Sequence, residues 1–171
     1  RPQIIFGTPD LVIKQMAARA GGRLTFDALK KFVADRAKSP GYESIFDQLK
    51  VVSGGDGNCS CELVVSPKML NDFGTLHGGV TASLVDAVST YALTTTGSGR
   101  PGSSVDLNIS YLRPVKVNEV ITISARTLSC GRTIAFSCVD ITKTNTGQLV
   151  AQGRHSKFVG EPKTSGSSTS S

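Results

Sequence analysis

Apolar side chains recur at helical spacing, and on most sides, along residues 77–96. Val80, Leu84, Val88 and Tyr91 follow one another at intervals of three or four residues, which is the spacing of one helix face. A helix that is apolar on most of its surface is enclosed by the rest of its domain. The pattern therefore predicts a long central helix over this stretch.

The second half of the chain alternates apolar and polar positions, which is typical of half-buried strands. It predicts strands at residues 104–112, 120–128, 134–142 and 149–159, in addition to one at 59–66 before the helix. In the strand at 104–112, one face is expected to carry Val105, Leu107, Ile109 and Tyr111, and the other Ser104, Asp106, Asn108 and Ser110. One long helix with five or six mainly antiparallel strands predicts an α+β domain whose sheet curves around the helix.

Capping and turn residues organise the flanking segments. Residues 26–39 show an amphipathic helical pattern with Thr25 as N-cap, and residues 42–49 indicate a further helical turn. The glycine-rich cluster at 53–58 predicts a turn. The chain is therefore expected to divide into an N-terminal extension at 1–24, one domain at 25–160 and a disordered, low-complexity tail at 161–171.

Composition limits the classes of partner. The net charge of +6 is spread along 171 residues and only 6% of them are aromatic, so a base-stacking nucleic-acid surface is not expected. No apolar run reaches the length of a membrane span. The net positive charge is as compatible with an anionic small ligand, such as a phosphorylated cofactor, as it is with a polynucleotide.

The cysteines and the N-terminal segment bear on the compartment. The four cysteines include no C-x-x-C pair, and the two histidines are the only other soft ligands, so neither a metal site nor a disulfide framework is predicted. Reduced thiols favour a cytoplasmic location. Residues 1–24 are basic and poor in acidic residues, which favours a flexible extension and leaves a mitochondrial targeting segment open.

The charge pattern singles out Asp86, the one formal charge of the central helix. An ionised carboxylate in apolar surroundings is costly unless it is paired, hydrogen-bonded or open to a cleft. Its own helix face carries the small polar side chains Ser83, Ser89 and Thr90, which leave room for a cleft. Asp86 is therefore a candidate site residue.

Two glycines, Gly78 and Gly79, follow His77 where the helix begins. The N–H groups of a first helical turn have no partner within the helix and lie at the positive end of its dipole. Because glycine carries no side chain, a substrate carbonyl oxygen can approach these groups and be stabilised as charge develops on it. The same pair is equally compatible with a tight loop entry or a close helix contact.

The spacing of these two features suggests a dimer. Gly78 and Asp86 are eight residues apart, which corresponds to ~12 Å along a helix that rises ~1.5 Å per residue. One helix therefore cannot bring both groups to the same reacting carbon, whereas two antiparallel copies can. If both features are catalytic, the enzyme is expected to be a dimer with two shared sites.

The whole motif resembles the hotdog-fold acyl-CoA thioesterases, and the likeness covers about residues 24–160. The motif consists of Asn71, Gly74, His77, Gly78, Gly79 and Asp86, followed by Gly102 and Ser104, Tyr111-x-x-Pro114 and the closing stretch at 151–155. The fold that this resemblance implies is a hotdog fold, in which the long helix is wrapped by the sheet.

The resemblance implies hydrolysis of medium- to long-chain fatty acyl-CoA to a free fatty acid and CoA, without a further cofactor, by a homodimer that pairs to a homotetramer. It implies that the Gly78 N–H polarises the thioester carbonyl. Asp86 of the neighbouring subunit would act as general base or nucleophile, with Ser104 holding the water. Asn71 and His77 would position the thioester and the loop.

The resemblance also implies CoA contacts from two segments, which contain Tyr111, Arg113, Pro114 and Lys116 in the first and Cys130, Gly131, Arg132 and Thr133 in the second. Guanidinium groups bind phosphate bidentately, and ammonium groups bind it as point charges. Arg113 and Lys116 are equally compatible with solvated charges at a strand end. His155, on the last strand, is expected to be a structural hydrogen-bonding residue.

Two other functions share these features: a non-hydrolytic acyl-CoA-binding dimer and a dehydratase acting on a 3-hydroxyacyl thioester. Dehydration requires a His–acid pair across the interface, whereas glycines directly after His77 suit carbonyl capture better. Release of a free thiol distinguishes hydrolysis from both.

Overall fold

The computed structural model describes residues 22–38, 41–97 and 99–160. Most of the predicted N-terminal extension and the whole predicted tail lie outside these ranges. The elements in chain order are α2 (Phe26–Ala37), η1 (Tyr42–Phe46), β1 (Lys50–Gly55), β2 (Asn58–Val64), η2 (Pro67–Met69), α3 (Gly78–Thr94), β3 (Ser103–Tyr111), β4 (Val120–Cys130), β5 (Ile134–Lys143) and β6 (Leu149–Phe158). The strands form one antiparallel sheet in the order β1-β2-β4-β5-β6-β3.

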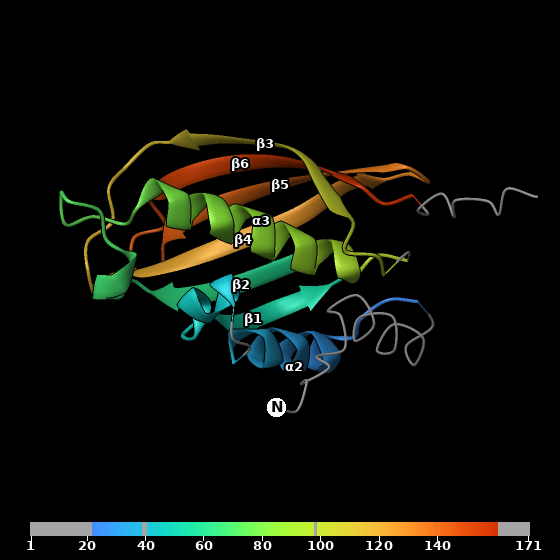
Figure 1. Cartoon of the computed structure of the whole chain (residues 1–171), viewed down its shortest axis with the longest axis horizontal. Coiled ribbons are helices and arrows are strands. Elements are labelled where there is room, and N and C mark those ends of the chain that lie inside the picture. Colours follow the sequence, from blue (N-terminus) through green and yellow to red (C-terminus); the bar gives the residue numbers. More distant parts are fainter. Residues whose placement is uncertain (1–21, 39–40, 98, 161–171) are drawn as a thin grey trace, which may run out of the picture.

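The helix α3 is the central helix that the apolar pattern predicts. It lies along one face of the curved sheet (Figure 1) and contacts β2, β4, β5 and β6. Its apolar residues Val80, Leu84, Val88 and Tyr91 are buried in the main core. In the part of the chain described here, no helix has the length and apolarity needed to cross a membrane.

The shorter helix α2 packs beside β1, as Figure 1 shows. Thr25 is its N-cap, as predicted, and accepts a hydrogen bond from the N–H of Ala28. Phe32 from α2 enters the core. Leu24, just before the cap, is buried, and its N–H donates to the carbonyl oxygen of Thr94 at the end of α3. These contacts attach α2 to both the sheet and α3.

The predicted turn before the first strand is wrong in its first half, because Lys50–Gly55 form the additional strand β1. The chain reverses only at Asp56 and Gly57, both of which have positive φ. Glycines weaken a strand pattern, so this strand resembles a loop in the sequence. A Cβ on Gly54 would lie 2.6 Å from Cδ2 of Leu29, so the glycine allows α2 to pack closely on β1.

The face predicted for Ser104 is also wrong. In the pairing of β3 with β6, Ser104 lies opposite Lys157 and Leu107 opposite His155, and the register shifts between Ser104 and Asp106. Lys157 and His155 are two residues apart on one strand and therefore share a face. The bulge thus places Ser104 on the same face as Leu107, because one extra residue inverts the alternation of side chains.

Candidate active site

Asp86 lies midway along α3 and opens onto a cavity of about 510 Å³. The cavity is bounded by α3, by α2 and η1, and by the residues leading into β3. The Asp86 side chain is 48% exposed, so an otherwise apolar helix presents one carboxylate to this cleft. The charge pattern of the helix predicts such a cleft.

Three side chains converge on one oxygen of Asp86. The hydroxyl of Ser104 donates to Oδ1 at 3.3 Å, and Nε2 of His155 and Nζ of Lys157 each lie 3.6 Å from the same atom. None of the hydrogen bonds in the described part of the chain goes to Oδ2, and Oδ1 is the oxygen nearer to both His155 and Lys157. The carboxylate is therefore held by one oxygen, and the other is left for a substrate or a water molecule.

His155 is almost completely buried beside this carboxylate. Its Nδ1 lies 2.7 Å from the hydroxyl of Ser89, which donates to the carbonyl oxygen of Asp86. Burial and the nearby charge of Lys157 lower the pKa of His155 below its ordinary value of 6.5, and Asp86 opposes this effect. His155 is therefore a neutral hydrogen-bonding residue within the core, as expected.

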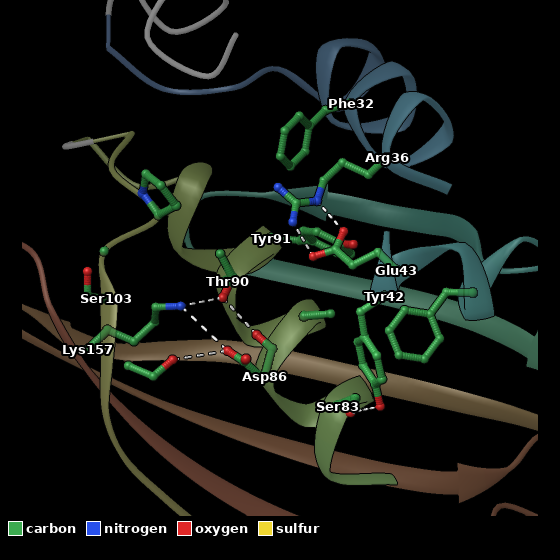
Figure 2. Close-up of a pocket in the computed structure, with 15 residues that line it drawn as sticks. Phe32, Arg36, Tyr42, Glu43, Ser83, Asp86, Thr90, Tyr91, Ser103 and Lys157 are labelled. Atoms are coloured by element: carbon green, nitrogen blue, oxygen red, sulfur yellow. Dashed lines mark hydrogen bonds and ion pairs between the residues drawn. The ribbon is translucent and has the colours of Figure 1, made fainter. Parts of the chain in front are cut away.

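Lys157 is a site residue that the sequence analysis missed. It is 5% exposed, and its Nζ donates to Oγ1 of Thr90 at 2.6 Å, beside Asp86 (Figure 2). Burial lowers the pKa of Lys157, and Asp86 opposes this by favouring the ammonium form. A signal was present, because Lys157 follows His155 by two residues on the buried face of β6.

The opposite wall of the cavity is polar as well. Arg36 of α2 and Glu43 of η1 form a bidentate ion pair, and the hydroxyls of Tyr42 and Ser83 lie 2.7 Å apart (Figure 2). The hydrogen bonds to Glu43 raise the pKa of Arg36. Nothing in the local sequence pattern predicted that α2 and η1 line the cleft with Asp86.

The start of α3 has the donor arrangement that the glycine motif suggests. His77 is the N-cap, and its Nδ1 accepts the N–H of Gly79 at 2.8 Å. The N–H of Gly78 makes no hydrogen bond within the described part of the chain. The carbonyl oxygen of Gly78 accepts a hydrogen bond from the hydroxyl of Tyr111 at 3.1 Å, which ties the helix start to the end of β3.

Asn71 holds the loop before the helix through its side-chain carbonyl. Its Oδ1 accepts the N–H of Phe73 at 3.0 Å, the N–H of Thr75 at 3.1 Å and the hydroxyl of Thr75 at 3.2 Å. Because three donors point at Oδ1, the orientation of the amide is determined. Its NH₂ group has no partner among the described residues and is available to a carbonyl oxygen.

Asn71 and Gly78 line a second cavity of about 390 Å³, together with Tyr111, Arg113 and Pro114. No residue lines both this cavity and that of Asp86. Since α3 is continuous from Gly78 to Thr94, the expected rise of ~12 Å between Gly78 and Asp86 applies. The predicted catalytic residues therefore form two separate groups within one chain.

The predicted CoA-binding residues also form two separate groups, one at each end of the sheet. Arg113, beyond the end of β3, donates to the carbonyl oxygen of Leu149, and the backbone N–H of Lys116 donates to Glu119. Both lie at the end of the sheet where Tyr111 pairs with Ala151.

The second predicted CoA segment lies at the other end of the sheet. Cys130 ends β4, and the residues up to Thr133 lead into β5, where Thr133 accepts a hydrogen bond from the N–H of Val159. Gly131 and the exposed Arg132 lie between them. Along β6, seven residues separate the two ends, roughly 23 Å at ~3.3 Å per residue. One chain does not bring the two segments together.

Metal and disulfide chemistry have no visible basis in this part of the molecule. Across the described residues, no three His, Cys, Asp or Glu side chains are grouped so as to hold a metal ion. The four cysteines, all within these ranges, form no disulfide.

Comparison with known proteins places this geometry in a family. Residues 73–150, which contain the helix start, Asp86 and Ser104, match the family model described as "Thioesterase superfamily". The mouse (Mus musculus) protein named "Acyl-coenzyme A thioesterase 13" is 47% identical over 123 residues, which are 72% of this chain and 88% of that protein. The chain therefore belongs to the thioesterase superfamily, as the motif predicted, and is a thioester hydrolase.

Solved structures agree with this assignment. The crystal structure of zebra fish thioesterase superfamily member 2 has a TM-score of 0.79 and 44% sequence identity, and the match covers 80% of this chain and 99% of that one. A hypothetical thioesterase from Streptococcus pneumoniae, whose structure contains coenzyme A, has a TM-score of 0.63 and 29% identity, with 67% and 90% covered. The predicted hotdog fold is thereby confirmed.

Proposed function

We propose that this protein hydrolyses fatty acyl-CoA of medium to long chain to a free fatty acid and CoA, at two sites shared between the subunits of a dimer. The mouse relative bears the name of an acyl-CoA thioesterase, and the similar streptococcal structure contains CoA. The medium to long acyl chain is what the family resemblance implies, and a series of acyl-CoA substrates of increasing length tests it.

The main support for a shared site is that its two halves, the Asp86 group and the Gly78 group, contact opposite ends of β3. Near the beginning of this strand, Ser104 donates to Asp86, and at its end Tyr111 donates to the carbonyl oxygen of Gly78. Antiparallel pairing of two copies of β3 would lay the Ser104 end of one strand against the Tyr111 end of the other. Each carboxylate would then meet the helix start of the other subunit.

The edge position of β3 and its exposed side chains support this pairing. This strand is an edge strand of nine residues in the described sheet, and Val105 is 61% exposed and Tyr111 57% exposed. A long edge strand with unpaired backbone groups and exposed apolar side chains is normally covered or paired. A second copy of the chain satisfies both the backbone and the exposed side chains. Two such dimers are expected to form the tetramer.

In the proposed reaction, the N–H of Gly78 and the NH₂ of Asn71 bind the thioester carbonyl oxygen. Oδ2 of Asp86 takes a proton from a water molecule, whose oxygen bonds to the carbonyl carbon, and Ser104 holds the carboxylate through Oδ1. The carbon–sulfur bond then breaks, and the CoA thiolate receives the proton. Removing one oxyanion donor costs about 10²–10³ in rate, and a positioned base contributes ~10²–10⁴.

CoA contacts are proposed for both predicted segments. Antiparallel pairing would bring the Cys130–Thr133 turn of one subunit towards Arg113 of the other, because these groups lie at opposite ends of the sheet in one chain. Arg113, Lys116 and Arg132 supply the positive charge for the phosphates.

The burial of one histidine and the hydrogen bond of the other argue against a dehydratase. His155 is buried, and His77 accepts the N–H of Gly79 with its Nδ1. Neither is placed to remove a proton from a hydroxyacyl group.

The decisive experiment is complementation between two inactive variants. Asp86→Asn and Asn71→Ala are each expected to abolish thiol release from a long-chain acyl-CoA. A mixed dimer of the two contains one site with both wild-type halves, so random co-assembly should restore about a quarter of wild-type activity. The matched control co-expresses Asp86→Asn with itself.

Each outcome bears on the proposal. Restored thiol release supports a site shared between subunits. A mixture as inactive as its parents contradicts the shared site. Binding of acyl-CoA by the wild-type protein without thiol release contradicts hydrolysis and favours the acyl-CoA-binding alternative.

A further inference from the structure

Lys157 occupies an unusual position for a lysine. Its side chain is 6% exposed, and it comes from the face of β6 that packs against α3. Lysine is almost never fully buried unless it is paired, because removing an ammonium group from water is unfavourable. The two polar groups that compensate for this burial are Oγ1 of Thr90 and Oδ1 of Asp86.

The side chains around the Asp86 carboxylate gather at one of its two oxygens. Lys157, Ser104 and His155 all approach Oδ1 of Asp86, at 3.6, 3.3 and 3.6 Å, and no hydrogen bond from a described residue reaches Oδ2. Thr90 extends the arrangement, since its hydroxyl accepts from Lys157 and donates to the Asp86 carbonyl oxygen at 2.7 Å. The ammonium is thus connected to both the side chain and the backbone of Asp86.

Charges on every neighbouring element act on this pair. Asp86 on α3 and Glu43 on η1 favour the ammonium form of Lys157, whereas Arg36 on α2 disfavours it. On β6, the charge of Lys157 helps to lower the pKa of His155, and Asp106 on β3 acts in the opposite direction. His155 is therefore neutral, and Lys157 is the cation that compensates for Asp86 within the site.

We propose that Lys157 is a positioning residue, which anchors Asp86 through Oδ1 so that Oδ2 faces the reacting water. The role rests on the proposed function, because it assigns a task within the same hydrolysis. Lys157 acts through the carboxylate, with Thr90 fixing the direction of the ammonium.

The test compares Lys157→Met with Lys31→Met, which removes a charge from the exposed face of α2. In Lys157→Met we expect kcat for acyl-CoA hydrolysis to fall at least ~10-fold while KM changes little, since the base is misplaced but the binding surface is intact. The Lys31→Met variant should match the wild type.

A second readout does not depend on turnover. In protein labelled with ¹⁵N at the lysine side chains, the Lys157 Nζ resonance, assigned with Lys157→Met, should titrate at lower pH in Asp86→Asn than in the wild type, because Asp86 favours the ammonium form of Lys157. An unchanged titration overturns the role of Lys157 even if the wild-type protein releases no thiol. Absence of thiol release with a shifted titration contradicts the proposed function and retains the electrostatic pairing.

Thr90→Val covers the case in which Lys157→Met does not fold. It keeps the shape of the side chain, removes the hydroxyl that receives the ammonium and should lower kcat in the same direction by a smaller factor. Wild-type kcat in a folded Lys157→Met or Thr90→Val variant overturns the proposal.

Discussion

Gly153 of β6 lies directly against Val85 of α3, so closely that a Cβ on the glycine would be 2.5 Å from Cγ1 of Val85. This contact is next to Asp86 in the helix and two residues from His155 in the strand. The close approach of helix and strand therefore sets the distance between the carboxylate and the side chains that hold it.

Gly153→Ala should destabilise the protein, because the added methyl group forces α3 away from the sheet. Overpacking of this kind costs about 1–3 kcal/mol. Urea unfolding measures the loss, and thiol release should fall as well, since Asp86 moves with the helix. Gly41→Ala is the control, because nothing lies within 4 Å of a Cβ at that position. Equal midpoints for the two variants would show that the contact is not tight in solution.

Gly78→Ala should fold normally and lose activity. Its Cβ would lie 3.5 Å from the Tyr111 ring, which is an ordinary contact, but the methyl group would occupy the path of a carbonyl oxygen to the N–H. Loss of one oxyanion donor predicts a decrease in kcat of about 10²–10³. Circular dichroism and a thiol-release assay check the two parts separately.

Gly79→Ala is predicted to behave differently. A Cβ there would lie 3.0 Å from Nδ1 of His77, so the N-cap must shift. Loss of a cap costs ~1 kcal/mol, and thermal unfolding should therefore show a lower midpoint than for Gly78→Ala. A lower midpoint for Gly78→Ala would contradict the assigned difference between the two glycines.

Ser104→Ala should lower kcat by ~10–100-fold, because a hydrogen bond to a charged group contributes about 1.5–3 kcal/mol. The bond concerned is the 3.3 Å contact with Oδ1 of Asp86. Ser110→Ala is the matched control on the same strand, and it should leave kcat unchanged. If both variants have the same rate, Ser104 does not act through the carboxylate.

The pH dependence of stability should report His155. Burial lowers the pKa of His155 in the native protein below its ordinary value of 6.5. As the pH falls through 6.5, the unfolded chain therefore binds more protons than the native protein does. The free energy of unfolding should therefore decrease as the pH falls through about 6.5, and increase again as the pH rises.

His155→Gln removes this titration. Urea unfolding between pH 5 and 8 should therefore show a smaller change in the free energy of unfolding with pH for His155→Gln than for the wild type. An identical pH dependence in the two proteins would exclude His155 as the source.

The sequence by itself determined the features that depend on neighbours in the chain. Helical spacing located α3, Thr25 marked the start of α2, and the spacing from Asn71 to Asp86 indicated the family. The separation of Gly78 from Asp86 also followed, because the rise of a helix per residue is constant.

The tertiary structure alone decided which distant side chains reach Asp86. A bulge in β3 turned Ser104 towards the helix, the pairing of β6 placed Lys157 beside Thr90, and the packing of α2 brought Arg36 to the cleft. These positions depend on strand register and on packing between segments far apart in the chain, and a one-residue shift in register reverses the face of a side chain. The local alternation of apolar and polar residues does not indicate where such a shift occurs.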